Sequence, residues 1–277
     1  MRKLMVIIPT VAALAALAYG LLLLFCATLA NRLIFPAPAA NYEKDDSIFF
    51  IGLPGGADFV AARVYPAKDA KYCIVYSHGN REDLGTIDPL MRIFQSIGYT
   101  VLAYDYVGYG LSSDSSPNPE KLRLAARAAF EFARDSLNFD VSNIVPVGYS
   151  LGSAAACHMA EAFPGVRALV LVGGFASIPY AILPFDPLPW ELLGNARIIE
   201  NLDGVPILIM HGTRDITVAP RNARINFKSA QSSPARLVWF EGYGHGGLFE
   251  SAEYWREIKN VIEDKKGYEK SSCTTVR

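Results

Sequence analysis

Short apolar runs, six in all, alternate with longer amphipathic stretches from residue 72 onward. Runs that are apolar throughout are typical of parallel strands, because helices cover both faces of a parallel sheet. The stretches between them carry apolar residues at helical spacing. The alternation therefore predicts β-α-β units around a mostly parallel sheet flanked by helices. The expected strands are residues 72–77, 100–104, 144–148, 168–172, 205–210 and 237–240.

Two earlier segments complete the expected sheet. Residues 47–51 and 59–65 flank Pro54-Gly55-Gly56 and predict an antiparallel pair, which brings the total to eight strands. The expected globular domain spans residues 47–265, and the polar residues 266–277 are expected to fray. The expected helices are residues 89–97, 120–136, 151–163, 220–230 and 252–265.

The N-terminal segment contains 27 residues, 4–30, without a charged side chain. This length exceeds the roughly 20 residues that a helix needs to cross a bilayer. A cleavable signal with a cleavage point at Ala30 and a buried core helix are the alternatives. We expect an uncleaved membrane anchor over residues 1–32, followed by a linker over residues 33–46 that Pro36 and Pro38 stiffen.

Basic residues around this segment predict its orientation. Arg2, Lys3 and the amino terminus precede the apolar residues, and Arg32 follows them. This excess favours an N-terminus in the cytoplasm. The globular domain of a single-pass membrane protein would then lie on the non-cytoplasmic side.

Charge and cysteine content exclude several classes of protein. The chain has 26 basic and 27 acidic residues, and this balance lacks the electrostatic footprint of a nucleic-acid-binding protein. The four cysteines have the spacing of neither a disulfide framework nor a zinc site. We expect no metal and no organic cofactor.

A G-x-S-x-G motif, Gly148-Tyr149-Ser150-Leu151-Gly152, stands where the expected strand 144–148 meets the next helix. A sharp strand-to-helix turn holds such a serine in a strained backbone conformation and presents its hydroxyl at the helix N-terminus. The motif predicts Ser150 as a nucleophile. The alternative is a helix-capping serine with incidental glycines.

A serine nucleophile needs a base, and the base needs a third group that orients it. His245 lies in a glycine-rich loop between the last expected strand and the last expected helix, and we predict it as the base. His158 lies within an apolar helix, and His78 and His211 stand at strand ends. These three are expected to be structural.

The expected acid is Asp215, which follows the strand 205–210 in His211-Gly212-Thr213-Arg214-Asp215. The catalytic order along the chain is then Ser, Asp, His. A turn or cap residue is the alternative reading of Asp215. The rival acids are Asp186, Asp203 and Glu241, which are displaced from the strand end, and Asp105, whose strand precedes the nucleophile.

Acyl transfer also needs backbone N–H donors that face the developing oxyanion. The Leu151 amide directly follows the nucleophile and is expected to be the first donor. The turn after the strand 72–77 is expected to supply the second donor through Asn80, with Arg81 as the neighbouring candidate. A polar turn without a catalytic task is the alternative.

Together these motifs carry a family resemblance over about residues 45–265. They are His78-Gly79-Asn80, Asp83-Leu84-Gly85, residues 105–112, the serine elbow, residues 211–215 and Gly244-His245. In this order they resemble the bud emergence protein-like alpha/beta hydrolases, a group that includes membrane-associated hydrolases and depalmitoylating thioesterases.

The resemblance implies an alpha/beta-hydrolase fold and specific roles for five residues. It implies Ser150, Asp215 and His245 as a catalytic triad and the amides of Asn80 and Leu151 as an oxyanion hole. Two features depart from the family pattern. Arg81 stands where such proteins usually have a small residue, and an N-terminal cysteine cluster for palmitate attachment is absent.

The expected function is that of a membrane-anchored serine hydrolase that cleaves an acyl ester or thioester through an acyl-enzyme. Its substrate would be a small or lipid-like acyl compound or an acylated protein. The apolar, proline-rich residues 176–202 predict either a packed connecting loop with a short helix or a rim that receives an acyl chain or touches the bilayer. The alternatives are a prolyl oligopeptidase-like peptidase and a non-catalytic binding protein.

Overall fold

The computed structural model describes residues 2–189, 192–264 and 271–276. The chain divides into two compact units, Met1–Pro36 and Ala37–Arg277. The division between the two units falls within the expected linker 33–46.

The first unit consists of two helices, α1 (Arg2–Thr28) and α2 (Ala30–Ile34). Within α1, the 18 residues Ile8–Phe25 have a mean hydropathy of 2.2. Among the described residues, α1 is the one helix that is long and apolar enough, by length and composition, to cross a membrane. Of the expected anchor 1–32, Met1 lies outside the described residues.

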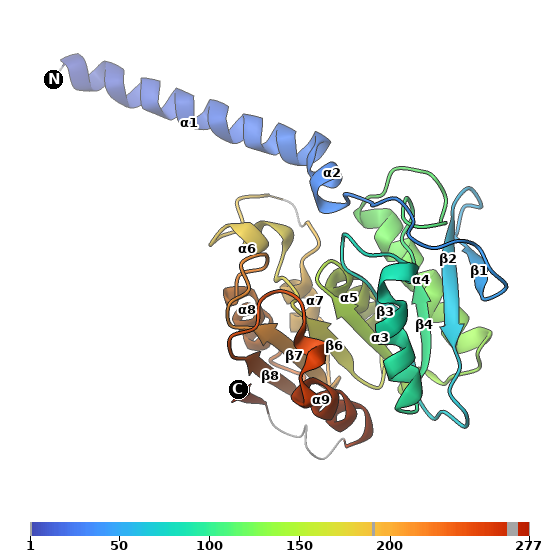
Figure 1. Cartoon of the computed structure of the whole chain (residues 1–277). Helices are drawn as coiled ribbons and strands as arrows, with labels where there is room; N and C mark the ends of the chain where they lie inside the picture. The colour runs from blue at the N-terminus through green and yellow to red at the C-terminus, as the bar shows by residue number, and fades with distance from the viewer. Residues whose placement is uncertain (1, 190–191, 265–270, 277) are drawn as a thin grey trace. The chain divides into compact units, whose positions relative to one another are not determined.

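The second unit is built around one nine-stranded sheet with the strand order β1-β2-β4-β3-β5-β6-β7-β8-β9 (Figure 1). The pairs β1–β2 and β2–β4 are antiparallel, and every later pair is parallel. Every position of β3, β4, β6 and β7 is buried, as expected for strands covered on both faces. The strands are β1 (Ile48–Gly52), β2 (Phe59–Tyr65), β3 (Cys73–Ser77), β4 (Thr100–Tyr104), β5 (Ile144–Tyr149), β6 (Leu169–Val172), β7 (Ile207–Gly212), β8 (Ala235–Phe240) and β9 (Ser272–Val276).

Helices lie on both sides of this sheet (Figure 1). Helices α3 and α9 lie over one face, where Phe94 and Tyr254 join the same buried apolar cluster as Tyr76. On the other face α4 and α5 lie side by side, and Phe130 stacks on Phe163 near the end of α5 with ring centroids 4.1 Å apart. The helices are α3 (Leu84–Ser96), α4 (Pro119–Asp135), α5 (Gly152–Ala162), α6 (Ile178–Ile182), α7 (Asn195–Asn201), α8 (Arg221–Ser229) and α9 (Ala252–Glu263), with 3-10 turns at Val141–Asn143 and Leu248–Glu250.

The C-terminal tail departs from the expectation. Residues 272–276 add β9 in parallel to β8, so the sheet has nine strands rather than eight. The Glu241 amide donates to the Val276 carbonyl at 2.9 Å, and this segment is rich in β-branched residues that suit a strand. Of the expected polar tail, residues 266–270 and 277 lie outside the described residues.

The proline-rich stretch 176–202 contains the short helices α6 and α7. Phe185 between them is 56% exposed, whereas Leu193 is buried. Trp190, which closes the apolar run of this stretch, lies outside the described residues. The described part thus combines packed helical turns with an exposed aromatic ring.

Candidate active site

The turn between β5 and α5 holds Ser150 in a left-handed conformation with φ of +50°. This φ is uncommon for a residue with a side chain and costs on the order of 1–3 kcal/mol. The Ser150 amide donates to the Val172 carbonyl at 2.9 Å, which ties the turn to the neighbouring strand β6. The sequence motif therefore forms the strained elbow that it predicts.

The two glycines of the motif allow close backbone approaches. A Cβ on Gly148 would lie 2.3 Å from the Gly152 carbonyl oxygen, which is too close for any side chain. A Cβ on Gly152 would lie 1.9 Å from the Ser77 carbonyl oxygen. The start of α5 is thus pressed against the end of β3, next to the turn that contains Asn80.

Three side chains from distant parts of the chain meet at this elbow. The Ser150 hydroxyl lies 2.8 Å from Nε2 of His245, and Nδ1 of His245 lies 2.7 Å from Oδ2 of Asp215. Ser150 is 9% exposed and so stays within reach of a small reactant. The structure brings together the three residues that the sequence predicts as nucleophile, base and acid.

Asp215 is buried and accepts hydrogen bonds on both carboxylate oxygens. Its Oδ1 accepts from the amides of Thr217 and Val218, each at 2.9 Å. Burial alone would raise the pKa of Asp215, but the hydrogen bonds from His211, His245 and the Val218 amide outweigh burial and lower the pKa. The carboxylate is therefore ionised at neutral pH and can only accept hydrogen bonds.

His211 is a contact of Asp215 that the sequence analysis missed. It is fully buried, and its Nε2 lies 2.8 Å from the Val218 carbonyl oxygen and 3.1 Å from Oδ2 of Asp215. Because a carbonyl only accepts, Nε2 carries the proton and also points it toward the carboxylate. His211 and Asp215 are four residues apart, a spacing that indicates a side-chain contact within a helix. Here the chain leaves a strand and turns, so this spacing did not predict the contact.

In the turn after β3, the backbone carbonyls of His78, Gly79 and Asn80 each accept a hydrogen bond from a side chain. The Tyr106 hydroxyl donates to the His78 carbonyl at 2.6 Å, and the Tyr109 hydroxyl donates to the Asn80 carbonyl at 3.1 Å. Nδ1 of His78 lies 2.7 Å from the Gly79 carbonyl oxygen. Since a trans peptide directs its N–H away from its carbonyl, these contacts fix the directions of the amides that follow.

The remaining sequence candidates have other partners. Asp186 accepts from the Ser177 hydroxyl at 2.8 Å, and His158 faces Glu161 on α5 at 3.7 Å. Asp203 and Glu241 are exposed. In the part of the chain that the structure describes, no group of three or more potential ligand residues could hold a metal ion.

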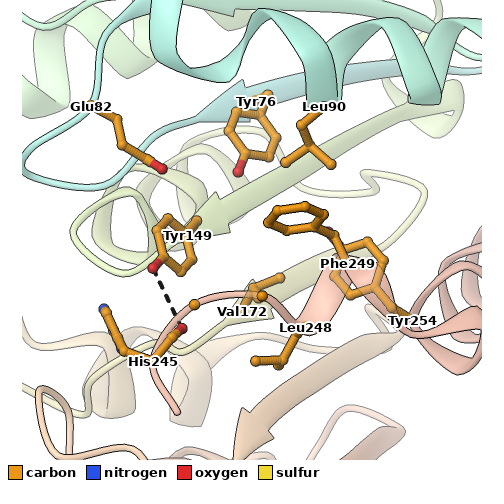
Figure 2. Close-up of a pocket in the computed structure, with 11 residues that line it drawn as sticks. Tyr76, Glu82, Leu90, Tyr149, Val172, His245, Leu248, Phe249 and Tyr254 are labelled. Atoms are coloured by element: carbon orange, nitrogen blue, oxygen red, sulfur yellow. Dashed lines mark hydrogen bonds between the residues drawn. The ribbon is translucent and has the colours of Figure 1, made fainter. Parts of the chain in front are cut away.

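A cavity of about 130 Å³ lies beside His245 on the α3 and α9 side of the sheet (Figure 2). Figure 2 shows the side chains of Tyr76, Leu90 and Phe249 around it, with the Glu82 carboxylate near the Tyr149 ring. An apolar cavity of about 150 Å³ can hold benzene, so this space suits one small apolar group. Its lining comprises Tyr76, Glu82, Leu90, Tyr149, Val172, His245, Gly246, Gly247, Leu248, Phe249 and Tyr254.

Comparison with known proteins identifies the family of this chain. Residues 48–194 match the sequence profile of a family described as alpha/beta hydrolase fold. The human alpha/beta hydrolase domain-containing protein 17B is 27% identical over 235 residues, which cover 82% of this chain and 78% of the relative. The putative alpha/beta hydrolase L404 of Acanthamoeba polyphaga mimivirus is 25% identical over 237 residues, which cover 84% and 88%.

Solved structures show the same fold. The Pyrococcus furiosus esterase Pf2001 superposes with a TM-score of 0.69 at 15% identity, covering 82% of this chain and 96% of the esterase. The profile matches more than half of the chain, and it includes the serine elbow and the turn that contains Asn80. The chain therefore belongs to the alpha/beta hydrolase fold family, as an enzyme of the serine hydrolase type.

Proposed function

We propose that this enzyme hydrolyses an acyl ester or thioester through an acyl-enzyme formed on Ser150. The observation that carries the proposal is the continuous hydrogen-bonded chain from the Ser150 hydroxyl through His245 to Asp215, with contacts of 2.8 and 2.7 Å. Contacts of this kind allow a histidine to remove the proton from a serine as it attacks.

Asp215 sets the tautomer of His245 in this mechanism. The ionised carboxylate accepts from Nδ1, so the Nε2 lone pair faces the Ser150 hydroxyl and can take its proton. The serine oxygen then attacks the carbonyl carbon, and His245 returns the proton to the departing alcohol or thiol. Water attacks the acyl-enzyme in a second step with the same proton transfers.

The developing oxyanion would be stabilised by two backbone amides. The Leu151 amide is the first N–H after the nucleophile and stands at the start of α5, where the helix dipole also favours negative charge. The Asn80 amide comes from the turn that is pressed against this elbow. Each such donor typically contributes a factor of about 10² to 10³ to kcat.

Substrate size is the next part of the proposal. We propose that the cavity beside His245 takes a short apolar part of the substrate, since its volume of about 130 Å³ suits a group no larger than a ring. A long acyl chain would not fit in this cavity and would have to bind elsewhere on the protein. The exposed ring of Phe185 is one apolar group that it could contact. The resemblance to a group with depalmitoylating members is why thioesters belong among the tested substrates.

Membrane attachment through α1 completes the proposal. The window Ile8–Phe25 supports a single membrane span by its length and hydropathy. The basic residues before this window favour a catalytic domain on the non-cytoplasmic side. Resistance of the membrane-bound protein to carbonate extraction, and protection of the catalytic domain from protease added on the cytoplasmic side, would support this topology. Release by carbonate would contradict the anchor.

Hydrolysis assays of the full chain in detergent test the enzymatic proposal. We expect turnover of p-nitrophenyl esters and acyl thioesters by the wild type, and loss of turnover in Ser150→Ala. Ser96→Ala is a matched control, because Ser96 is an exposed serine on α3 whose hydroxyl donates to the local Ile93 carbonyl. Folded wild-type protein that hydrolyses no acyl compound of any chain length would contradict the proposal and favour a binding role.

A further inference from the structure

Asn41 and Tyr42, which precede β1, form hydrogen bonds with residues around the turn that contains Asn80. The Tyr42 hydroxyl donates a hydrogen bond to Oδ2 of Asp105 and accepts from the Leu111 amide at 3.1 Å. Burial and the neighbouring Asp105 both raise the pKa of Tyr42, so the phenol keeps its proton and is the donor of the pair.

Asn41 makes a second set of contacts one residue earlier. Its amide donates to Oδ2 of Asp83 at 2.8 Å, and its side-chain nitrogen donates to the Thr86 hydroxyl at 2.8 Å. Asp83 is the N-cap of α3 and also accepts from the Thr86 amide at 2.9 Å. Asn41 therefore supports the cap that begins α3, directly after the Asn80 turn.

Two glycines of the sequence motifs make room for these contacts. A Cβ on Gly85 would lie 2.0 Å from Oδ1 of Asn41. A Cβ on Gly110 would lie 1.7 Å from Oδ2 of Asp105 and 2.6 Å from the Tyr42 hydroxyl. The two glycines thus leave the space that Asn41, Tyr42 and Asp105 occupy, and Gly110 also adopts a left-handed φ of +50°.

Asp105 connects Tyr42 to the turn itself. This carboxylate is fully buried, and its Oδ1 accepts from the Leu84 amide at 2.9 Å and lies 3.4 Å from Nε2 of His78. The other ring nitrogen of His78 donates to the Gly79 carbonyl at 2.7 Å. The Gly79 carbonyl belongs to the same peptide as the Asn80 N–H, so its position sets the direction of that N–H.

We propose that Asn41 and Tyr42 are positioning residues that hold the turn with the Asn80 amide in its reactive geometry. Neither residue touches the reacting atoms. They act through Asp83, Asp105 and His78, and the inference rests on the proposed function because it takes the Asn80 amide as an oxyanion donor. The segment between the apolar helix and the sheet is then part of the catalytic unit rather than a passive spacer.

Tyr42→Phe removes one hydroxyl and leaves Asp105 with one donor fewer. Loss of the whole Asn80 donor would lower kcat by about 10² to 10³, and a turn that is only partly displaced should lower kcat by about 10-fold. KM should stay within about 2-fold, because an oxyanion donor acts in the transition state. Affinity for a trifluoromethyl ketone inhibitor, which forms an oxyanion on the serine, should fall in parallel with kcat.

Tyr99→Phe is the matched control. Tyr99 is also a largely buried tyrosine that donates to a carboxylate, Glu263, at 2.8 Å, but it lies away from the elbow between the ends of α3 and α9. We expect this variant to lower the melting temperature by a similar amount and to keep wild-type kcat. Asn41→Ala, with an expected 3- to 5-fold loss in kcat, carries the test if Tyr42→Phe does not fold.

The outcomes separate the two proposals. An inactive wild type would contradict the proposed function itself. An active wild type with Tyr42→Phe and Tyr99→Phe indistinguishable in kcat and inhibitor affinity would overturn the positioning role. A rise in KM with unchanged kcat would also overturn it, because this result would place Tyr42 in substrate binding.

Discussion

Asp215→Asn is the substitution whose effect the structure determines most fully. The Asp215 Oδ1 position accepts two backbone amides, from Thr217 and Val218, so the carboxamide oxygen of the variant must take this position. The carboxamide NH₂ group then lies at the Oδ2 position and faces Nδ1 of His245. It can only donate there, which leaves the His245 proton on Nε2 and removes the base that faces Ser150.

The expected loss in kcat is about 10⁴-fold, the magnitude that this tautomer change has in a serine protease triad. It corresponds to about 5.5 kcal/mol in activation free energy. His211 increases the effect, because its Nε2 proton also points at Oδ2 from 3.1 Å and would meet a donor instead of an acceptor. KM should change little, since the substrate does not contact Asp215 directly.

Steady-state hydrolysis of a p-nitrophenyl ester over pH 6 to 9 measures this loss. Asp186→Asn is the matched control, because Asp186 is the rival acid and accepts from the Ser177 hydroxyl and the Leu188 amide. It should retain kcat within about 3-fold. Asp215→Asn with more than a tenth of wild-type kcat would refute the role of Asp215 as the orienting acid.

Three further predictions concern the surroundings of the site and the stability of the fold. His211→Leu should lower kcat/KM by about 10-fold, because Asp215 loses the Nε2 donor that lies 3.1 Å from its Oδ2 and is then held less firmly against His245. His211→Gln, which keeps a donor, should restore most of this loss, and equal effects of the two variants would contradict the role of His211. Leu90→Trp fills part of the cavity, so kcat/KM for the preferred acyl ester should fall by about 10-fold relative to the acetyl ester, and an unchanged chain-length profile would exclude the cavity as a substrate site. Burial raises the pKa of Glu257 from 4.5 to about 7, so the folded state retains a proton that the unfolded state has lost, and the free energy of unfolding should fall as pH rises through this window. Glu257→Gln should flatten that slope by up to about 3 kcal/mol between pH 4.5 and 8, measured by chemical denaturation, and a slope equal to that of the wild type would contradict the assignment.

Patterns within single segments predicted most of the architecture. Apolar runs that are buried on both faces have few alternative structures, and the expected strands 59–65 and 100–104 coincide with β2 and β4 residue for residue. Helix α3 starts five residues before the expected residue 89, because Asp83 caps it from a stretch with little apolar periodicity. Strand β9 was not predicted, because its residues are mostly polar and show no apolar pattern. It forms by pairing with the edge of the sheet at β8.

Contacts between distant segments set the limits of the site prediction. The elbow motif and the chain order indicated Ser150, Asp215 and His245, and the structure brings these three within hydrogen-bond distance. The contact of His211 with Asp215 depends on how the chain turns after β7 and has no sequence period. The contact between Tyr42 and Asp105 spans 63 residues and was likewise not predictable from local patterns.

Fluorophosphonate labelling followed by peptide mapping is the most direct test of Ser150 as the nucleophile. The full chain in detergent should gain one adduct, on the peptide with Ser150, with loss of the fluoride leaving group. Ser150→Ala should remain unlabelled, and Ser96→Ala should label like the wild type. Folded wild-type protein without an adduct, or an adduct that persists in Ser150→Ala, would contradict the role of Ser150 as the nucleophile.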